Sequence, residues 1–269
     1  MATQPNSHRY GWIADQPDHR DYLYAAPQGI VDTLPPKVDL RSHCPPIYNQ
    51  GRIGSCTANS IAGAVQFTRR VEDLAPDFVP SRLFIYWNER NLEHTVPVDS
   101  GAQLRDGIKI VHQLGVCPET GWSYDDTPAD PASHLWPDGA KAALRPTDSC
   151  FAAALNHQAT SYRRVARSLV QMKGCLASGY PFVLGFAVYE SFESAVVART
   201  GIVDLPKHDE SRLGGHAVLA IGYDDTTQRF LIRNSWGPAW GLKGCFTMPY
   251  AYLLDATLAS DFWTIRVVE

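Results

Sequence analysis

The sequence predicts an α+β fold in which a helical half comes first and an antiparallel, β-rich half follows. Several stretches of the first half repeat apolar residues at the i, i+3, i+4, i+7 spacing of a helix face. After about residue 180 the pattern changes to short apolar runs bounded by glycine, proline or polar turns, which is typical of strands. Helices and strands that are segregated in this way favour two packed halves with a groove between them.

Bulk composition limits the classes of protein to which the chain can belong. A net charge of -4 and the lack of a long basic run argue against nucleic acid or an anionic membrane as a partner. No apolar run approaches the roughly 20 residues that a membrane helix needs. The polar N-terminus lacks the apolar segment of a secretory signal, so we expect a cytoplasmic or non-classically exported protein.

The chain divides into an N-terminal extension, residues 1–33, and a main domain, residues 34–269. The extension has few aliphatic residues but several charged and aromatic ones, and a pair of prolines follows it. We expect it to be irregular and to lie on the body of the domain. Within the domain, the helical half covers about residues 34–150 and the β-rich half about residues 151–269.

Helices are predicted to begin at about residues 56, 82, 104 and 165. Ser81 is the expected N-cap of the second helix, and Gly115 and Gly179 end the third and fourth. Residues 121–156 are rich in proline, aspartate and alanine with weak periodicity, which indicates a long connection or insertion.

Strands are predicted mainly in the second half. A polar turn joins two of them into an antiparallel hairpin. The predicted strands cover residues 38–40, 182–188, 216–223, 229–234, 244–248 and 261–267.

Cys56 stands where a glycine-containing loop meets the first predicted helix. Unpaired N–H groups and the positive dipole end of a helix favour an anion, so a thiol at this point is biased towards the nucleophilic thiolate. Gln50 lies six residues upstream, near enough for its amide to face whatever Cys56 attacks. A buried structural cysteine is the alternative, and this stretch alone does not exclude it.

A histidine and an asparagine on the predicted hairpin complete a candidate site. His216 begins one strand, after two glycines that leave room for a ligand to approach the backbone. Asn234 ends the adjacent strand, where its amide can orient the imidazole, and Trp236 can cover that contact. Cysteine-based acyl transfer needs a thiolate, an imidazole, an orienting group and donors for the oxyanion. Packing or turn roles would explain each residue singly, but the combination favours a reactive site.

The cysteines do not form a metal-binding pattern. They are widely spaced with no CxxC pair, so we expect neither a metal nor another cofactor. If Cys56 is free, five remain, and mostly reduced thiols are the simplest reading, with one disulfide left open. The six cysteines stand at positions 44, 56, 117, 150, 175 and 245.

From about residue 34 to the C-terminus the sequence resembles the papain-like cysteine peptidases. The resemblance rests on Asn-Gln-Gly-x-x-Gly-Ser-Cys at 49–56, Gly-His-Ala-Val at 215–218 with Gly-Tyr at 222–223, and Asn-Ser-Trp-Gly-x-x-Trp-Gly at 234–241. Three motifs in the family's order are much more specific than any one of them. The divergent flanks suggest a bacterial member.

This resemblance implies a papain-like two-subdomain fold, with a helical left half, an antiparallel β-barrel-like right half and the active site in the groove between them. It also implies a role for each matched residue. Cys56 is the expected nucleophile, His216 the general acid/base and Asn234 the residue that orients it. Gln50 and the Cys56 N–H form the expected oxyanion hole. Ser100, Gly101, Gly215 and Trp236 are the expected substrate-binding residues.

The chain also departs from the family pattern. Thr57 replaces the usual aromatic residue after the nucleophile, and Ile53 replaces a cysteine that forms a family disulfide. His216 follows Cys56 by 160 residues, more than the usual ~130–150, so we place an insertion within residues 121–160. Residues 1–33 are too few for the domain-sized propeptide of many members. We hypothesise that they cover the groove as an intramolecular ligand.

The expected function is therefore that of a cysteine-type endopeptidase acting on peptide or protein substrates through a thioester acyl-enzyme. Two alternatives stay open: transfer of the acyl group to an acceptor other than water, as in a transpeptidase, and a catalytically silent peptide-binding homologue. Ser260 or Asp261 is expected at the floor of the selective substrate pocket. An aspartate there favours a basic side chain and a serine an apolar one.

Overall fold

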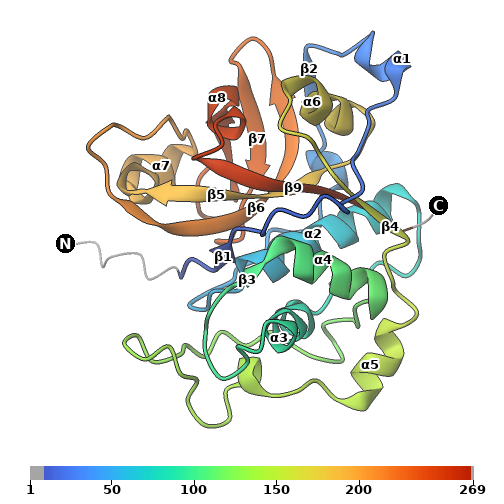
Figure 1. The fold of residues 1–269 in the computed structure, drawn as a ribbon, viewed down its shortest axis with the longest axis vertical. Coiled ribbons are helices and arrows are strands. Elements are labelled where there is room, and N and C mark those ends of the chain that lie inside the picture. The colour runs from blue at the N-terminus through green and yellow to red at the C-terminus, as the bar shows by residue number, and fades with distance from the viewer. Residues whose placement is uncertain (1–8, 268–269) are drawn as a thin grey trace.

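The computed structural model describes residues 9–267 as a group of helices packed against an antiparallel sheet (Figure 1). The helices of the first half are grouped on one side of the molecule and the strands of the second half on the other. Their bounds are α2 Cys56–Val71, α3 Arg82–Leu92, α4 Leu104–Gln113 and α5 Asp148–Ala154.

Seven strands of the described residues form one sheet, in the order β4-β9-β5-β6-β7-β8, with β2 paired to β6. Neighbouring strands run antiparallel throughout. The sheet is open along this order, so the expected barrel-like closure is not found among the described strands. The strands are β2 Lys37–Asp39, β4 Ser161–Arg164, β5 Phe182–Tyr189, β6 Arg212–Asp224, β7 Arg229–Arg233, β8 Cys245–Pro249 and β9 Ala259–Arg266.

The sheet is buried on both faces, which gives the protein two hydrophobic clusters. One cluster joins α2, α3 and α4 to side chains of β5, β6 and β9. The other lies on the opposite face, against α6 Leu169–Ala177, α7 Ala195–Thr200 and α8 Tyr250–Leu254. Because α2 packs on β6, residues far apart in the sequence meet where the two halves join.

The predicted helices and strands are confirmed in type, and the expected caps are in place. The Ser81 hydroxyl accepts a hydrogen bond from the Phe84 N–H at 3.1 Å, and Gly115 and Gly179 have the positive φ of helix ends. The fourth helix, α6, begins at Leu169 rather than near 165. The Val165 N–H instead donates to the carbonyl of Phe262 in β9, so Val165 continues the pairing of β4 with β9.

Several short elements were not predicted. In the main domain they are α5, α7, α8 and the strands β3 (Ala102–Gln103) and β4, and in the extension, which was expected to be irregular, they are β1 (Trp12–Ile13) and α1 (Gln28–Val31). Three of those in the main domain are helices of only five to seven residues, too short for a clear apolar period. Helix α5 lies within residues 121–156, so this stretch is not a featureless connection. Thr147 caps α5 by accepting a hydrogen bond from the Cys150 N–H.

The N-terminal segment crosses the boundary between the two halves, as the dark blue chain in Figure 1 shows. Its strand β1, Trp12–Ile13, pairs in parallel with β3, Ala102–Gln103, on the helical side. It then continues to helix α1, Gln28–Val31, beside α6. Through these two contacts the described part of the extension packs on the rest of the chain, and residues 1–8 lie outside the described part.

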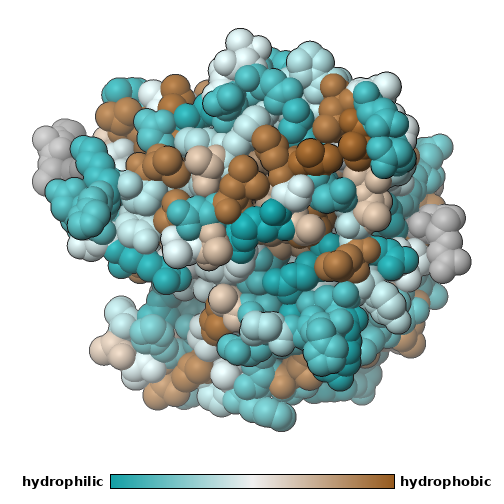
Figure 2. Space-filling model, turned by 45° about the horizontal axis from the view of Figure 1, so that its top comes forward, coloured by the Kyte–Doolittle hydropathy of each residue, from teal (hydrophilic) through white to brown (hydrophobic). Residues whose placement is uncertain are grey.

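None of the helices described between residues 9 and 267 is long and apolar enough to cross a membrane. On the face drawn in Figure 2, exposed apolar side chains are interspersed with polar ones.

Candidate active site

Cys56 is the first residue of α2 and is fully buried. The preceding loop is fixed from the helical half, because the Gly54 N–H donates to both carboxylate oxygens of Asp99 at 3.0 Å. The Tyr86 hydroxyl donates to the same carboxylate at 2.5 Å. These bonds hold the entry to α2 and thereby determine where the thiol lies.

His216 and Asn234 are in direct contact, as the hairpin pattern predicts. The distance from His216 Nε2 to Asn234 Oδ1 is 2.8 Å, and the Ser235 N–H donates to the same oxygen at 2.8 Å. An oxygen that already accepts from a backbone N–H is the acceptor of the ring contact too, so Nε2 carries the hydrogen. Nδ1 is then the ring atom that can take up and release a proton.

Trp236 covers this pair. Its ring centroid lies 5.0 Å from that of His216 with the planes tilted by 34°, and the indole is only 5% exposed. The buried Trp236 indole therefore lies against the His216 ring, on the side of the His216–Asn234 pair that was expected to be shielded.

Gln50 is held by both halves. Its side-chain oxygen accepts from the Ser235 hydroxyl at 2.7 Å, and its amide nitrogen donates to the carbonyls of Ile53 and Arg9, each at 3.1 Å. The amide orientation is thus fixed with the NH₂ group towards a carbonyl oxygen. This is the direction that an oxyanion donor requires.

Residues 9–12 of the N-terminal segment lie beside these groups, since Gln50 donates to the Arg9 carbonyl and Trp12 lies against Gly215. Burial by this segment and by the sheet raises the pKa of Cys56 from its ordinary 9.0 to about 12, although the N–H groups of Ala217 and Gly11 lower it. The bias towards thiolate expected at a helix start is therefore reversed in this covered form, because water is excluded from the sulfur.

The predicted substrate-binding residues lie against the segment, with one exception. The indole of Trp12 lies over Gly215 and Gly185, where an added Cβ would come within 2.6 and 1.9 Å of the ring. A Cβ at Gly101 would come within 2.1 Å of the Gly11 carbonyl. Ser100 instead turns its hydroxyl to Thr95 at 2.8 Å, away from the groove.

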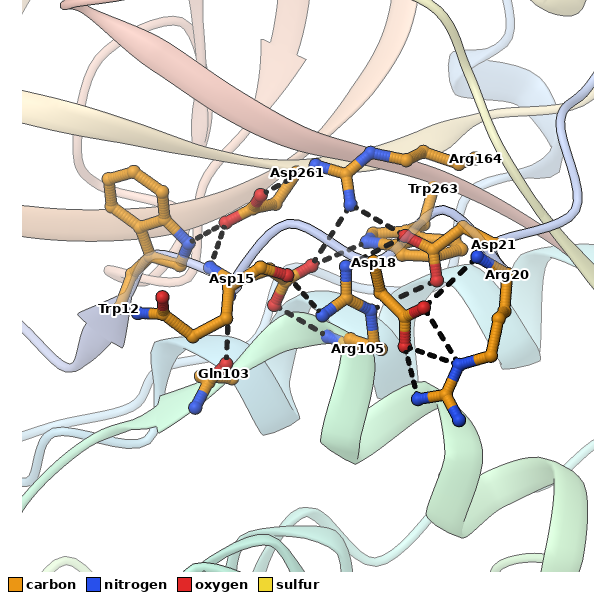
Figure 3. Close-up of polar contacts among 11 residues, drawn as sticks. Trp12, Asp15, Asp18, Arg20, Asp21, Gln103, Arg105, Arg164, Asp261 and Trp263 are labelled. Carbon is orange, nitrogen blue, oxygen red and sulfur yellow. Dashed lines mark hydrogen bonds and ion pairs between the residues drawn. The ribbon is translucent and has the colours of Figure 1, made fainter.

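A cluster of three carboxylates and two guanidinium groups fastens the segment to both halves (Figure 3). Asp261 on β9 accepts from the Trp12 indole at 3.0 Å and from the Asp15 N–H at 2.9 Å. Asp15 accepts from the Arg105 N–H at 3.1 Å and from the Trp263 indole at 3.0 Å.

The arginines of this cluster come from opposite sides of the groove. Arg105, on α4, pairs with Asp21 at 2.7 Å. Arg164, on β4, pairs with Asp21 at 2.9 Å and with Asp261 at 3.1 Å. Since Asp15, Asp21 and Asp261 outnumber the two arginines, the docked cluster is left with one excess negative charge unless it takes up a proton.

No group of three or more histidine, cysteine or acidic side chains suited to a metal ion occurs within residues 9–267. All six cysteines are free thiols in the structure.

Sequence reasoning missed residues that organise the site, among them Asp99 and Tyr124. Asp99 precedes the Ser100-Gly101 loop, and this position was the only feature of the sequence that could have indicated its role in the site. Tyr124 lies in the stretch read as a connection, and its hydroxyl contacts Ser55 Oγ at 2.6 Å and donates to the Gln50 carbonyl at 2.9 Å. Nothing in the local pattern indicates a contact across such a sequence separation.

Comparison with known proteins identifies the class of this fold. A sequence profile described as papain family cysteine protease matches residues 99–258, more than half of the chain. The chain belongs to the papain family of cysteine proteases, which are hydrolases acting on peptide or protein substrates. The matched range begins after Gln50 and Cys56.

Three relatives span most or all of the chain. The crystal structure of xylellain, a cysteine protease from Xylella fastidiosa, is 48% identical with a TM-score of 0.92 and full coverage of both chains. A peptidase C1-like protein of Acanthamoeba polyphaga mimivirus is 39% identical over all of this chain and 90% of its own. A cathepsin B-like protein of Giardia intestinalis is 27% identical over 81% of this chain and 69% of its own.

We predict that Asp99→Asn destabilises the protein by about 2 kcal/mol, because hydrogen bonds to a buried charged group are worth about 1.5–3 kcal/mol each and only some are lost. Urea unfolding followed by tryptophan fluorescence measures this change. Asp138→Asn, at an exposed loop position, is the control and should leave the midpoint unchanged. Equal midpoints for the two variants would show that Asp99 does not hold the loop.

Proposed function

We propose that the chain is a cysteine endopeptidase in which Cys56 is the nucleophile, His216 the general acid/base and Asn234 the residue that orients His216. The observation that carries the proposal is the His216–Asn234 hydrogen bond, on a hairpin that also reaches the thiol. The N–H of Ala217, the residue after His216, faces the Cys56 sulfur. The two halves thus bring the imidazole strand to the start of α2.

In the proposed reaction the Cys56 thiolate attacks a peptide carbonyl and forms a thioester with the acyl part of the substrate. Gln50 Nε2 and the Cys56 N–H donate hydrogen bonds to the oxyanion. His216 gives its proton to the leaving amine and then takes one from the water that hydrolyses the thioester. The fixed Gln50 amide supports this role, since its NH₂ already binds a carbonyl oxygen, that of Arg9.

We predict that Cys56→Ala abolishes cleavage of a peptide library and that Gln50→Ala lowers kcat by about 10²–10³-fold, the usual cost of losing one oxyanion donor. Mass spectrometry of the products, with and without an added amine acceptor, separates hydrolysis from acyl transfer. Cys44→Ala, a half-buried thiol elsewhere, is the control. Cleavage by the Cys56→Ala variant would refute the proposed nucleophile.

The same contacts support a second part of the proposal: residues 9–24 act as an intramolecular ligand that covers the groove. Gln50 binds the Arg9 carbonyl, while Gly11 presents its N–H to the Cys56 sulfur. An N–H facing the sulfur gives the thiolate nothing to attack at that point. The segment is therefore held in the groove as a ligand rather than as a substrate.

Docking of this segment is coupled to proton uptake. Burial, and then the charge of Asp261, raise the pKa of Asp15 from its ordinary 3.8 to about 6. Because the docked form has the higher pKa, the protonated carboxyl favours docking. The contribution of protonated Asp15 to the free energy of docking is complete below about pH 4 and is lost as the pH rises through about 6. Higher pH thus loosens the segment.

We predict that the rate of Cys56 alkylation rises more steeply with pH in the full-length wild type than in Asp15→Asn. Between about pH 4 and about pH 7 the ratio of the two rates should increase by up to about 10²-fold. Peptide mapping after brief treatment with iodoacetamide measures the rate at Cys56. The ratio between the two proteins at each pH removes the intrinsic titration of the thiol.

Asp18→Asn is the matched control, because Asp18 lies on the same segment but pairs with its neighbour Arg20, whose hydrogen bonds hold the pKa of Asp18 below its ordinary value and so outside this pH range. It should follow the wild-type pH dependence. If Asp15→Asn also follows it, proton uptake by the cluster does not govern docking.

Asp261 supports a preference for a basic or donor-bearing side chain in the adjoining pocket. Its carboxylate already binds the indole N–H of Trp12, and Arg164 Nη2 lies 3.1 Å from its other oxygen. The hollow beside it, about 570 Å³ in volume, is lined by Ser260 as well. A donor on a substrate side chain that replaces Trp12 would meet the same carboxylate.

We predict that Asp261→Asn lowers kcat/KM for peptides with arginine at the pocket position about tenfold relative to otherwise identical leucine peptides. The ratio of the two substrates within one variant cancels any change in the fraction of covered enzyme. Ser260→Ala is the neighbouring control and should leave the ratio unchanged. An unchanged ratio in Asp261→Asn would exclude Asp261 as a determinant of specificity.

A further inference from the structure

Glu89 is a fully buried carboxyl group directly behind the proposed nucleophile. It lies on α3, and its Oε2 accepts a hydrogen bond from the Thr57 hydroxyl at 2.9 Å. Thr57 follows Cys56 in the first turn of α2, where the papain-like pattern usually has an aromatic residue. Thr57, which stands in place of the usual aromatic residue, is thus hydrogen-bonded to an acidic residue of the neighbouring helix α3.

The space for this carboxyl is provided by a glycine on a third helix. A Cβ at Gly107 of α4 would come within 2.1 Å of Glu89 Oε1 and within 2.5 Å of Ile61. Oε1 itself has no hydrogen-bond partner among residues 9–267. An ionised carboxylate would leave that oxygen buried without water or a hydrogen-bond donor, which strongly disfavours the charged form.

The charged groups around Glu89 do not offset this cost. Glu93, the C-cap of α3, and Asp106 on α4 are acidic, and both raise the pKa of Glu89 further after the larger effect of burial. Arg90 is the cation facing it, but the Arg90 guanidinium donates to the carbonyls of Val96, Val98 and Ala142. Glu89 is therefore held as a neutral acid.

The start of α2 is the positive end of a helix, and two acidic groups lie within its reach. A Cys56 thiolate and a Glu89 carboxylate would share the same favourable potential and repel each other. Accordingly, negative charge on Glu89 raises the pKa of Cys56. Only one of the two groups is expected to be ionised when the thiol reacts.

We propose that Glu89 is a positioning residue of the proposed reaction: as a neutral acid it holds Thr57, and with it the first turn of α2, and its ionisation opposes formation of the Cys56 thiolate. The inference rests on the proposed role of Cys56. It assigns no contact between Glu89 and the substrate, so its effect passes through Thr57 and through the local field.

The test compares Glu89→Gln, a neutral isostere, with Glu89→Ala in the full-length chain. At about pH 6 we expect kcat/KM of Glu89→Gln to stay within about twofold of the wild type and that of Glu89→Ala to fall at least about tenfold. As the pH rises to about 10, the wild type should lose activity relative to Glu89→Gln by about tenfold. Alkylation of Cys56 over the same range gives a readout independent of cleavage.

The pH dependence of the stability towards urea provides a second measurement, and the physical argument determines its direction. The folded state keeps Glu89 protonated, whereas the unfolded chain ionises it above its ordinary pKa of 4.5, so stability falls as the pH rises above that value. The urea midpoint of Glu89→Gln should exceed that of the wild type at about pH 8, and the gap should close near about pH 4. Glu190→Gln, at an exposed position, should show no such gap.

Three results would overturn the inference: a pH-independent ratio of wild type to Glu89→Gln, a loss of more than about tenfold in Glu89→Gln at about pH 6, or equal urea midpoints at about pH 8. These outcomes are separable from failure of the proposed function. Wild-type protein without peptidase activity would count against the reaction, while alkylation and unfolding would still decide whether Glu89 is a neutral acid coupled to the thiol.

Discussion

The packing of α2 against β6 is the constraint on which the rest of the site depends. It brings the first residue of a helix from one half beside the His216 strand of the other. A Cβ at Gly63 of α2 would lie 3.7 Å from Leu219 Cδ2 of β6 and 3.7 Å from Arg233 Nε of β7, so the helix packs closely on these two strands. Arg233 donates to the carbonyls of Pro45 and Pro46, which precede the Gln50 loop. The same contact therefore places the thiol, the imidazole strand and the loop of the proposed oxyanion donor.

The parts of the site that the sequence predicts are those whose chemistry is encoded locally. Cys56 at a helix start, His216 on a strand and Asn234 at the end of its hairpin partner each carry a local signal, and their contacts follow from strand pairing. The helix caps and strands of the main domain follow from the same short-range rules. Short elements such as α5 and β4 do not, because fewer than two turns or a few residues give no measurable period.

What the sequence does not predict are the polar contacts between distant segments. Asp99, Tyr124 and Glu89 are ordinary residues in their local contexts, and only the packing of loops and helices makes them part of the site. That the extension covers the groove was a hypothesis from the sequence and remains a proposal. Its attachment through Asp15 and Asp261, from opposite ends of the chain, depends on a balance of charges that no local pattern contains.

Under the proposal that residues 9–24 cover the groove, the covering of the groove and the protonation of the thiol are two aspects of one equilibrium. In the covered form burial raises the pKa of Cys56, so the thiol is neutral there. Departure of the segment returns water to the sulfur and lowers that pKa towards its ordinary value. By linkage, conditions that favour the thiolate also favour the uncovered form. Rising pH therefore acts twice in the same direction, once through Asp15 and once through Cys56, until the buried Glu89 begins to ionise and opposes the thiolate.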